Sequence, residues 1–226
     1  MCTYENLVAA TLPYGLAPLV VPQLKTITLG GAVTGLGIES TSFRSGLPHE
    51  SVSEIDILTG DGEIITATPT NEHADLFFGF PNSYGTLGYS VRLRIELEPV
   101  KPYVALRHVR FTSVAELQST METIVTDKTY DGEHVDYLDG VVFSANESYL
   151  TVGRQTDEEG AVSDYTGMDI YYRSVQSKTT DRLTITTTSG AGTPTGSGAR
   201  ALSVRRTRTS AAGGRSATCA AASTGS

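Results

Sequence analysis

The stretch from Tyr89 to Glu98 reads YSVRLRIELE and constrains the fold more tightly than any other part of the chain. Every second residue in it is apolar, at Val91, Leu93, Ile95 and Leu97. Because successive side chains of a strand point to opposite faces, this pattern predicts a half-buried antiparallel strand. Two prolines follow, at positions 99 and 102, and predict a domain boundary.

The segments on both sides of this strand are typical of an α+β fold. Before it, we expect a short helix over residues 3–12, a hairpin of residues 52–58 and 63–68, and a helical turn over residues 73–80. After it, Ser113 and Glu116 predict a capping box at the start of a helix. The residues that follow form a helical apolar stripe: Val114, Leu117, Met121 and Ile124. Strands are expected around that helix, at residues 103–111, 140–144, 148–152 and 168–172.

The composition changes from about residue 179. Beyond Asp181 the chain has no further acidic residue, no aromatic residue and six arginines. Such a segment has almost nothing to bury, so it predicts a disordered tail. We therefore expect three parts: residues 1–100, residues 101–180, and a disordered tail over residues 181–226.

The tail also suggests a shift of reading frame. GC-rich codons for residues 186–200, read two nucleotides out of phase, can encode an aromatic peptide with tryptophan, whereas the chain itself has no tryptophan. We hypothesise a frameshift between residues 179 and 186. A gene sequence without an insertion or deletion there would contradict this.

Charge and composition exclude several classes of function. The net charge of −8 argues against a nucleic-acid groove, which needs the opposite sign, and six arginines without aromatic residues are a weak nucleic-acid signal. The four histidines and two cysteines show no metal-ligand spacing, so no metal is expected. No apolar run approaches the roughly 18 residues of a membrane span, and the start lacks a signal pattern. A cytoplasmic protein is the default expectation.

The glycine-rich stretch TLGGAVTGLGIESTS, residues 28–42, allows three interpretations. Gly35 and Gly37 could begin a dinucleotide fingerprint, but Ser40 stands where its third glycine belongs. The glycines could instead form a bulge or tight corner of a β-rich domain. In the third interpretation the backbone lies along a flavin, and the hydroxyls of Thr34, Ser40 and Ser42 donate hydrogen bonds to it.

Three segments together resemble a known family. They are PQLKTITLGGAVTGLGIESTSFRSGL, the strand pair around TGDGEIITATP, and DLFFGFPNSYGTLGYSVRLRIELEP. In this order and spacing they resemble the FAD-binding PCMH-type domain of the vanillyl-alcohol-oxidase superfamily, and within it the sterol side-chain reductase-like FAD-linked proteins. The resemblance covers about residues 4–180.

The resemblance implies a non-covalent FAD site in which backbone N–H groups hold the pyrophosphate. The glycine-rich block contains no histidine, so nothing in it suggests a covalent histidine–flavin link. The residues that match the FAD-contacting block are Thr28, Gly30, Gly31, Thr34, Gly35, Gly37, Ile38, Glu39, Ser40 and Ser42, and a second turn over residues 85–88 contributes Gly85 and Gly88. We assign no catalytic acid or base, because in flavoenzymes the cofactor performs the hydride chemistry.

The resemblance also implies the kind of reaction and two departures from the family. The intact form would oxidise or reduce a carbon–carbon bond of a hydrophobic, sterol-like substrate, with NADPH as a possible donor. Family members carry a further subdomain before the position of Met1, and the segment after residue 101 resembles only the start of a substrate-cap domain. We therefore expect a truncated chain that binds FAD weakly or not at all alone; the alternative function is an inactive gene fragment.

Overall fold

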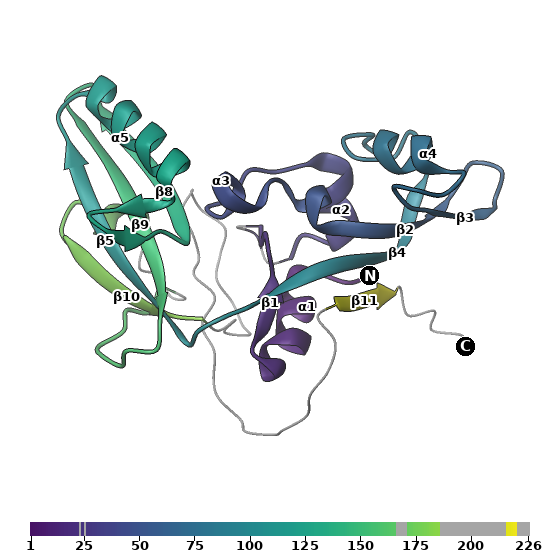
Figure 1. The fold of residues 1–226 in the computed structure, drawn as a ribbon, viewed down its shortest axis with the longest axis horizontal. Helices are drawn as coiled ribbons and strands as arrows, with labels where there is room; N and C mark the ends of the chain where they lie inside the picture. The colour runs from purple at the N-terminus through teal and green to yellow at the C-terminus, as the bar shows by residue number, and fades with distance from the viewer. Residues whose placement is uncertain (23, 25, 166–170, 186–215, 221–226) are drawn as a thin grey trace. The chain divides into compact units, whose positions relative to one another are not determined.

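The computed structural model describes residues 1–22, 24, 26–165 and 171–185, and the backbone of residues 216–220 (Figure 1). These residues fall into two compact units. The first unit lies within residues 1–38, 45–99 and 207–226, and the second within residues 39–44 and 100–206. The chain passes from the first unit to the second between residues 99 and 100, and residues 216–220 belong to the first unit again.

The first unit is built on an antiparallel sheet in the order β1-β4-β2-β3, with β11 also paired to β4. Its strands are β1 (Leu16–Pro18), β2 (Val52–Leu58), β3 (Ile64–Ala67), β4 (Tyr89–Pro99) and β11 (Ser216–Ala220). Its helices are α1 (Tyr4–Thr11), η1 (Leu12–Tyr14), α2 (Leu29–Gly35), η2 (Pro48–Ser51) and α4 (Ala74–Gly79), and the short α3 (Ser42–Ser45) spans a boundary between the units.

The sequence pattern explains how the sheet of the first unit forms. In β4 the alternating residues Leu93, Ile95 and Leu97 are buried, and they join the main core of this unit. The predicted hairpin is present as β2 and β3. The predicted first helix is also confirmed, because Thr3 accepts a hydrogen bond from the N–H of Asn6 and so caps α1.

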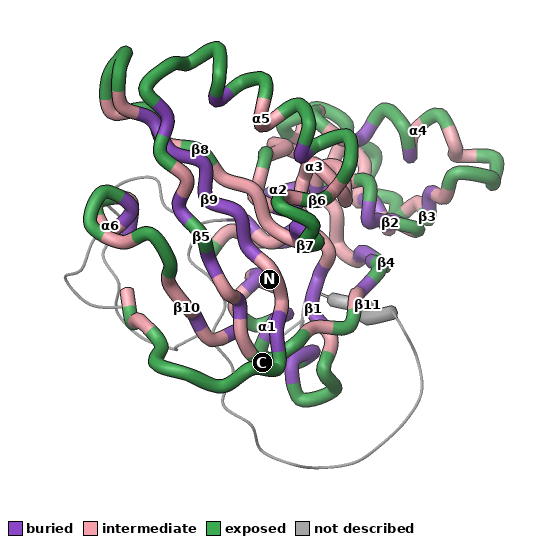
Figure 2. Tube along the Cα trace, turned by 60° about the vertical axis from the view of Figure 1, so that its left-hand side comes forward, coloured by how far each residue is buried: buried purple, intermediate pink, exposed green. Residues whose placement is uncertain are grey.

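The second unit is an antiparallel sheet in the order β10-β5-β9-β8. Its elements are β5 (Tyr103–Phe111), α5 (Val114–Asp127), the hairpin β6 (Thr129–Tyr130) and β7 (Glu133–His134), β8 (Tyr137–Ser144), β9 (Glu147–Thr156), α6 (Tyr171–Ser174) and β10 (Thr180–Thr184). Residues 148–153 of β9 are all buried, whereas much of α5 is exposed (Figure 2). Strand β9 is therefore covered on both faces.

Helix α5 packs its apolar stripe against β9, but it begins differently from the expectation. Leu117 and Ile124 are buried in a core cluster with Leu150 and Val152 of β9. Ser113 occupies the N-cap position, yet its side chain makes no capping hydrogen bond, so the predicted capping box is wrong. Among the described residues, no helix has the length and apolar character of a membrane span.

Two expectations about the end of the chain need correction. Residues 171 and 172 lie in helix α6 and not in a strand, while residues 168–170 of that expected strand lie outside the described residues. The first residues of the expected disordered tail, 181–184, lie in strand β10, where Leu183 is buried, and Ile185 directly after the strand is buried as well. Strand β11 is likewise paired, with residues 92–96 of β4. The remaining tail, including the proposed frameshifted peptide, lies outside the described residues.

Candidate cofactor-binding site

The first half of the glycine-rich stretch forms the short helix α2. Thr28 caps it, since its hydroxyl accepts a hydrogen bond from the N–H of Gly31 over 3.1 Å. Leu29 and Val33 point into the core of the first unit. At Gly30 the helix lies so close to β4 that an added Cβ would stand 2.2 Å from the hydroxyl oxygen of Ser90. A glycine here thus has a packing reason of its own.

The residues that lead into the second predicted turn, residues 85–88, close the other end of α2. The last carbonyls of a helix lack partners within it. Here the N–H of Asn82 donates to the carbonyl of Val33 over 3.4 Å, and the N–H of Tyr84 donates to the carbonyl of Thr34 over 3.2 Å. The Tyr84 hydroxyl donates to the carbonyl of Gly35 over 3.4 Å. The two glycine-containing segments are therefore joined by three hydrogen bonds.

The turn itself needs glycine at its end. Gly88 has a φ of +125°, which side-chain-bearing residues rarely adopt. A Cβ at this position would also stand 2.3 Å from the carbonyl oxygen of Leu58. The turn is thus held against β2 at Gly88. At the start of the turn, Gly85 also has a positive φ, of +83°.

A cavity of about 470 Å³ opens where α2, this turn and the start of β4 meet. Six of the twelve predicted FAD-contacting residues line it: Thr28, Gly30, Gly31, Thr34, Gly85 and Gly88. The other described side chains that line it are Met1, Cys2, Leu29, Tyr84, Tyr89, Ser90, Val91 and Leu93. None of these described side chains is acidic or basic, so the side chains of the lining offer a ligand only hydroxyl, sulfur and apolar groups beside the backbone.

The other predicted residues are not in this cavity. A Cβ on Gly35 would meet nothing within 4 Å, and the side chain of Ile38 is 84% exposed. Glu39, Ser40 and Ser42 belong to the second unit. There, the N–H of Glu39 donates to the hydroxyl of Ser42, and the carbonyl of Ser40 accepts from the N–H of Leu138 over 2.8 Å. Gly37 stands between Gly35 and Ile38 in the sequence and does not line the cavity either.

Hydrogen bonds within the protein limit what α2 offers a ligand. In its first turn, the N–H of Leu29 already donates to the carbonyl of Cys2, and the N–H groups of Gly31 and Ala32 donate to Thr28. The hydroxyl of Thr34 donates to the carbonyl of Gly30 over 2.9 Å. Thr34 can thus accept a hydrogen bond from a ligand, but its proton is already used. This differs from the expected donor role.

Two tyrosines that the sequence reasoning did not select also line the cavity. The side chains of Tyr84 and Tyr89 are 75% and 71% exposed, although tyrosine rings are usually at least half buried. They flank Gly85, and a Cβ there would stand 4.0 Å from the ring of Tyr89. Exposed aromatic faces beside a glycine turn suit contact with a flat ring. Their position on both sides of the GTLG sequence was the signal that could have identified them.

Comparisons with known proteins place this site in context. No protein-family model matches the chain. The chain is 32% identical over 156 residues to a Delta(24)-sterol reductase of Pisum sativum, and the aligned part covers 67% of this chain and 28% of that protein. It is 33% identical over 153 residues to the Delta(24)-sterol reductase of Mus musculus, with 68% and 27% covered. It is 34% identical over 140 residues to cytokinin dehydrogenase 9 of Oryza sativa subsp. japonica, with 61% and 25% covered.

The chain thus spans little more than a quarter of the length of the curated relatives that it matches. The similarity includes about two thirds of the chain and extends to two groups of enzymes with different printed names. The resemblance stated from the sequence motifs is confirmed: this chain is a homologue of the FAD-binding PCMH-type oxidoreductases, the family of the Delta(24)-sterol reductases and of this cytokinin dehydrogenase.

Proposed function

We propose that the cavity of the first unit is part of an FAD site in an oxidoreductase that acts on a carbon–carbon bond of a hydrophobic, sterol-like substrate. One observation carries the proposal. Two glycine-containing segments, matched separately to the FAD-contacting parts of the family, lie on either side of one cavity whose described lining has no acidic or basic side chain. The names of the homologues support the substrate class, and NADPH is the proposed donor.

The residues around the cavity fit a non-covalently bound flavin nucleotide. Its volume lies within the range of roughly 300–1,000 Å³ that small-molecule sites have. Tyr84 and Tyr89 offer ring faces, and Thr28 keeps a hydroxyl proton to donate. When bound, FAD would supply the hydride chemistry, while these residues bind and orient it. No catalytic acid or base is proposed.

The two units take the roles that the family resemblance assigns them. In this proposal, residues 1–100 are the second subdomain of the FAD-binding domain, and residues 101–180 begin the substrate cap. Glu39, Ser40 and Ser42 remain predicted cofactor contacts that do not line the cavity of the first unit. The chain spans little more than a quarter of the length of the relatives that it matches, so we propose weak FAD binding by this chain alone. The second candidate function is an inactive fragment.

Titration of the purified chain with FAD tests the proposal. Binding should quench flavin fluorescence and shift the flavin absorbance bands. Tyr89→Ala should weaken this binding, because it removes an exposed ring face from the lining of the cavity. Tyr14→Ala is a matched control, since Tyr14 is an exposed tyrosine of the same unit that does not line the cavity. No change in the flavin spectrum at any accessible concentration would favour the inactive fragment.

A further inference from the structure

The register of the sheet in the second unit places two arginines on either side of one alanine. Ala105 of β5 pairs with Arg154 of β9 and also with Arg182 of β10. Directly paired residues point to the same face of a sheet, and neighbouring strands lie about 4.8 Å apart. Two long cationic side chains therefore extend from the same face, with only a methyl group between them.

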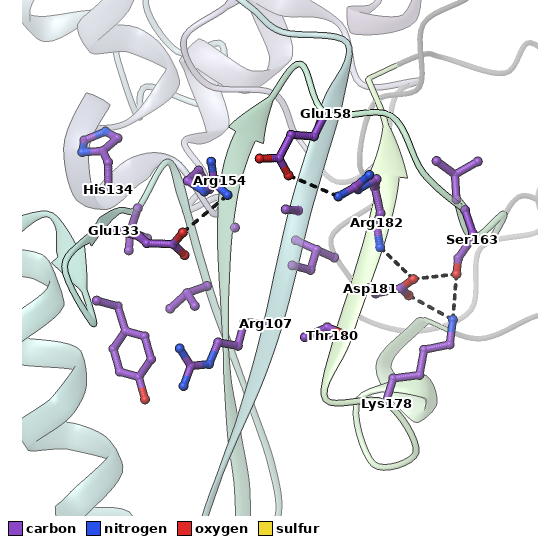
Figure 3. A pocket seen from close by; sticks show the side chains of 18 residues that line it. Arg107, Glu133, His134, Arg154, Glu158, Ser163, Lys178, Thr180, Asp181 and Arg182 are labelled. Carbon is purple, nitrogen blue, oxygen red and sulfur yellow. Dashed lines mark hydrogen bonds and ion pairs between the residues drawn. The ribbon is translucent and has the colours of Figure 1, made fainter.

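A cavity of about 720 Å³ lies over this face (Figure 3). Ala105 and Val152 contribute to its lining from the sheet, and Val162 contributes from the loop that precedes α6. On the other side the hairpin of β6 and β7 contributes Tyr130 and Glu133. The volume is that of a site for a small organic molecule and not for a single ion. The lining offers both apolar contact and charge.

The two arginines are incompletely satisfied within the described part of the chain. Arg154 faces Glu133 at 3.5 Å and Arg182 faces Glu158 at 3.6 Å, and neither guanidinium donates a hydrogen bond to another described residue. The two carboxylates are 64% and 68% exposed. Ion pairs with such exposed partners contribute little free energy. An incoming anion can therefore replace them at low cost.

Arg92 of the first unit shows what a structural arginine looks like in this protein. It also lies in a sheet, but its guanidinium donates hydrogen bonds to Asp56 and Glu54 over 2.5–3.0 Å. These short hydrogen bonds use its donors within the fold. Arg154 and Arg182 keep their donors available at the cavity, and this difference points to a ligand.

The loop beside β10 fixes the position of Arg182. The N–H of Ser163 donates to the carbonyl of Arg182 over 2.9 Å, so this loop is attached to the outer edge of the strand. A Cβ on Gly160 would stand 2.3 Å from a terminal nitrogen of the guanidinium. The glycine backbone therefore lies directly against the cation, and the Arg182 side chain is only 22% exposed. A held guanidinium loses less entropy when it binds an anion.

We propose that this cavity binds an organic anion: a carboxylate or phosphate monoester attached to an apolar body. Arg154 and Arg182 bind the oxyanion across Ala105, Glu133 and Glu158 move aside, and Val152 and Val162 contact the apolar body. Four cationic and three acidic side chains line the cavity, in a chain whose net charge is −8. The cavity shares no residue with the cavity of the first unit, so the proposal does not depend on FAD binding.

Calorimetric titration of the full chain with phenyl phosphate, benzoate, inorganic phosphate and phenol tests this. Phenyl phosphate or benzoate should bind more tightly than inorganic phosphate, because only they carry an apolar body, and phenol should not bind. Either order of phenyl phosphate and benzoate supports the proposal and identifies the preferred anion. Arg154→Gln and Arg182→Gln should each weaken binding at least about tenfold, because each loses charge-assisted hydrogen bonds.

Two further variants separate a site from a change in overall charge or fold. Arg94→Gln removes the same charge from an exposed position on β4 and should leave binding unchanged. Gly160→Ala keeps every charge but displaces the Arg182 guanidinium, so it should weaken phenyl phosphate binding. Unfolding curves confirm that each variant is folded. Absence of phenyl phosphate and benzoate binding to the unmodified chain, or equal binding by the Arg154→Gln/Arg182→Gln variant, would overturn the proposal.

Discussion

The backbone N–H of Tyr84 donates to the carbonyl of Thr34 over 3.2 Å and joins two glycine-containing segments that are separated by the whole β2–β3 hairpin. This contact closes the C-terminal end of α2 and places the turn over residues 85–88 beside the start of the helix. The cofactor cavity that we propose in the first unit depends on that junction. The first two predictions test the glycines that make it possible.

Gly88→Ala should destabilise the first unit strongly. The new Cβ would stand 2.3 Å from the carbonyl oxygen of Leu58, and the φ of +125° would be strained for alanine. We expect a loss of about 2–4 kcal/mol in the free energy of unfolding, measured in urea, because backbone strain and overpacking add. Gly60→Ala is the control, since a Cβ there meets nothing within 4 Å and should change stability little. Equal effects of the two substitutions would contradict the close contact between the turn and β2.

Gly30→Ala should be harmful only while Ser90 is present. The added Cβ would stand 2.2 Å from the Ser90 hydroxyl oxygen but 3.6 Å from its Cβ, an ordinary contact. In a Ser90→Ala background, the same change should therefore be neutral or stabilising by up to about 1 kcal/mol, because alanine favours the helix over glycine. A double-mutant cycle of urea unfolding measures the coupling. Additive effects would mean that α2 does not contact β4 as described.

Acid should weaken the second unit through His108. Burial holds the pKa of His108 below its usual value near 6.5; the Asp181 carboxylate raises that pKa and the Lys178 ammonium lowers it. The folded state therefore binds the proton less readily than the unfolded state. The stability contributed by neutral His108 is complete above about pH 6.5 and is lost as the pH falls toward the lower folded-state pKa.

A substitution at His108 checks this dependence. His108→Gln keeps a side chain that can bond to the hydroxyl of Thr151, which lies 2.8 Å from Nδ1, but it cannot titrate. The difference in unfolding free energy between pH 7.5 and pH 5.5 should therefore shrink in this variant. An unchanged pH dependence would show that His108 does not take part.

Asp181→Asn should destabilise the second unit at neutral pH. Burial would raise the pKa of Asp181, but hydrogen bonds from Ser163, Tyr165 and Lys178 outweigh it and hold that pKa below its usual value. This carboxylate therefore contributes stability above about pH 4, which is lost as the pH falls through its lower folded-state pKa. Because its side chain is only 5% exposed, we expect a loss of about 2–4 kcal/mol in urea unfolding.

An exposed carboxylate provides the comparison for Asp181. Asp61 lies in the turn of the β2–β3 hairpin and is exposed, so Asp61→Asn should leave the unfolding free energy almost unchanged. If Asp181→Asn were equally mild, the hydrogen bonds that converge on the Asp181 carboxylate would contribute little to the fold.

Local patterns in the sequence predicted the regular elements but not how the tail and the glycine-rich stretch fold. Alternation in residues 89–98 predicted β4, and the apolar stripe from Leu117 to Ile124 predicted α5. Strand β10 was missed because the composition of the whole tail outweighed two buried residues, Leu183 and Ile185. Helix α2 was missed because glycine has low helix propensity, and tertiary packing overrides it here.

Part of the candidate site could be predicted and part could not. The motifs selected both segments that line the cavity, since glycine is required where backbones lie as close as Gly88 and Leu58. Nothing local in the sequence indicated that Glu39, Ser40 and Ser42 would belong to a different unit from Thr28. The same limit applies to Arg154 and Arg182, whose proximity follows only from strand register.

Amide chemical-shift mapping of the ¹⁵N-labelled chain during a titration with FAD tests the central claim most directly. If one cofactor cavity is formed by the two glycine-containing segments, the amides of residues 28–35 and 84–90 should shift together and saturate with a single dissociation constant. Tyr89→Ala should raise that dissociation constant, because it removes an exposed ring face from the cavity. Shifts confined to the second unit, or no saturable shifts in either segment, would contradict the account.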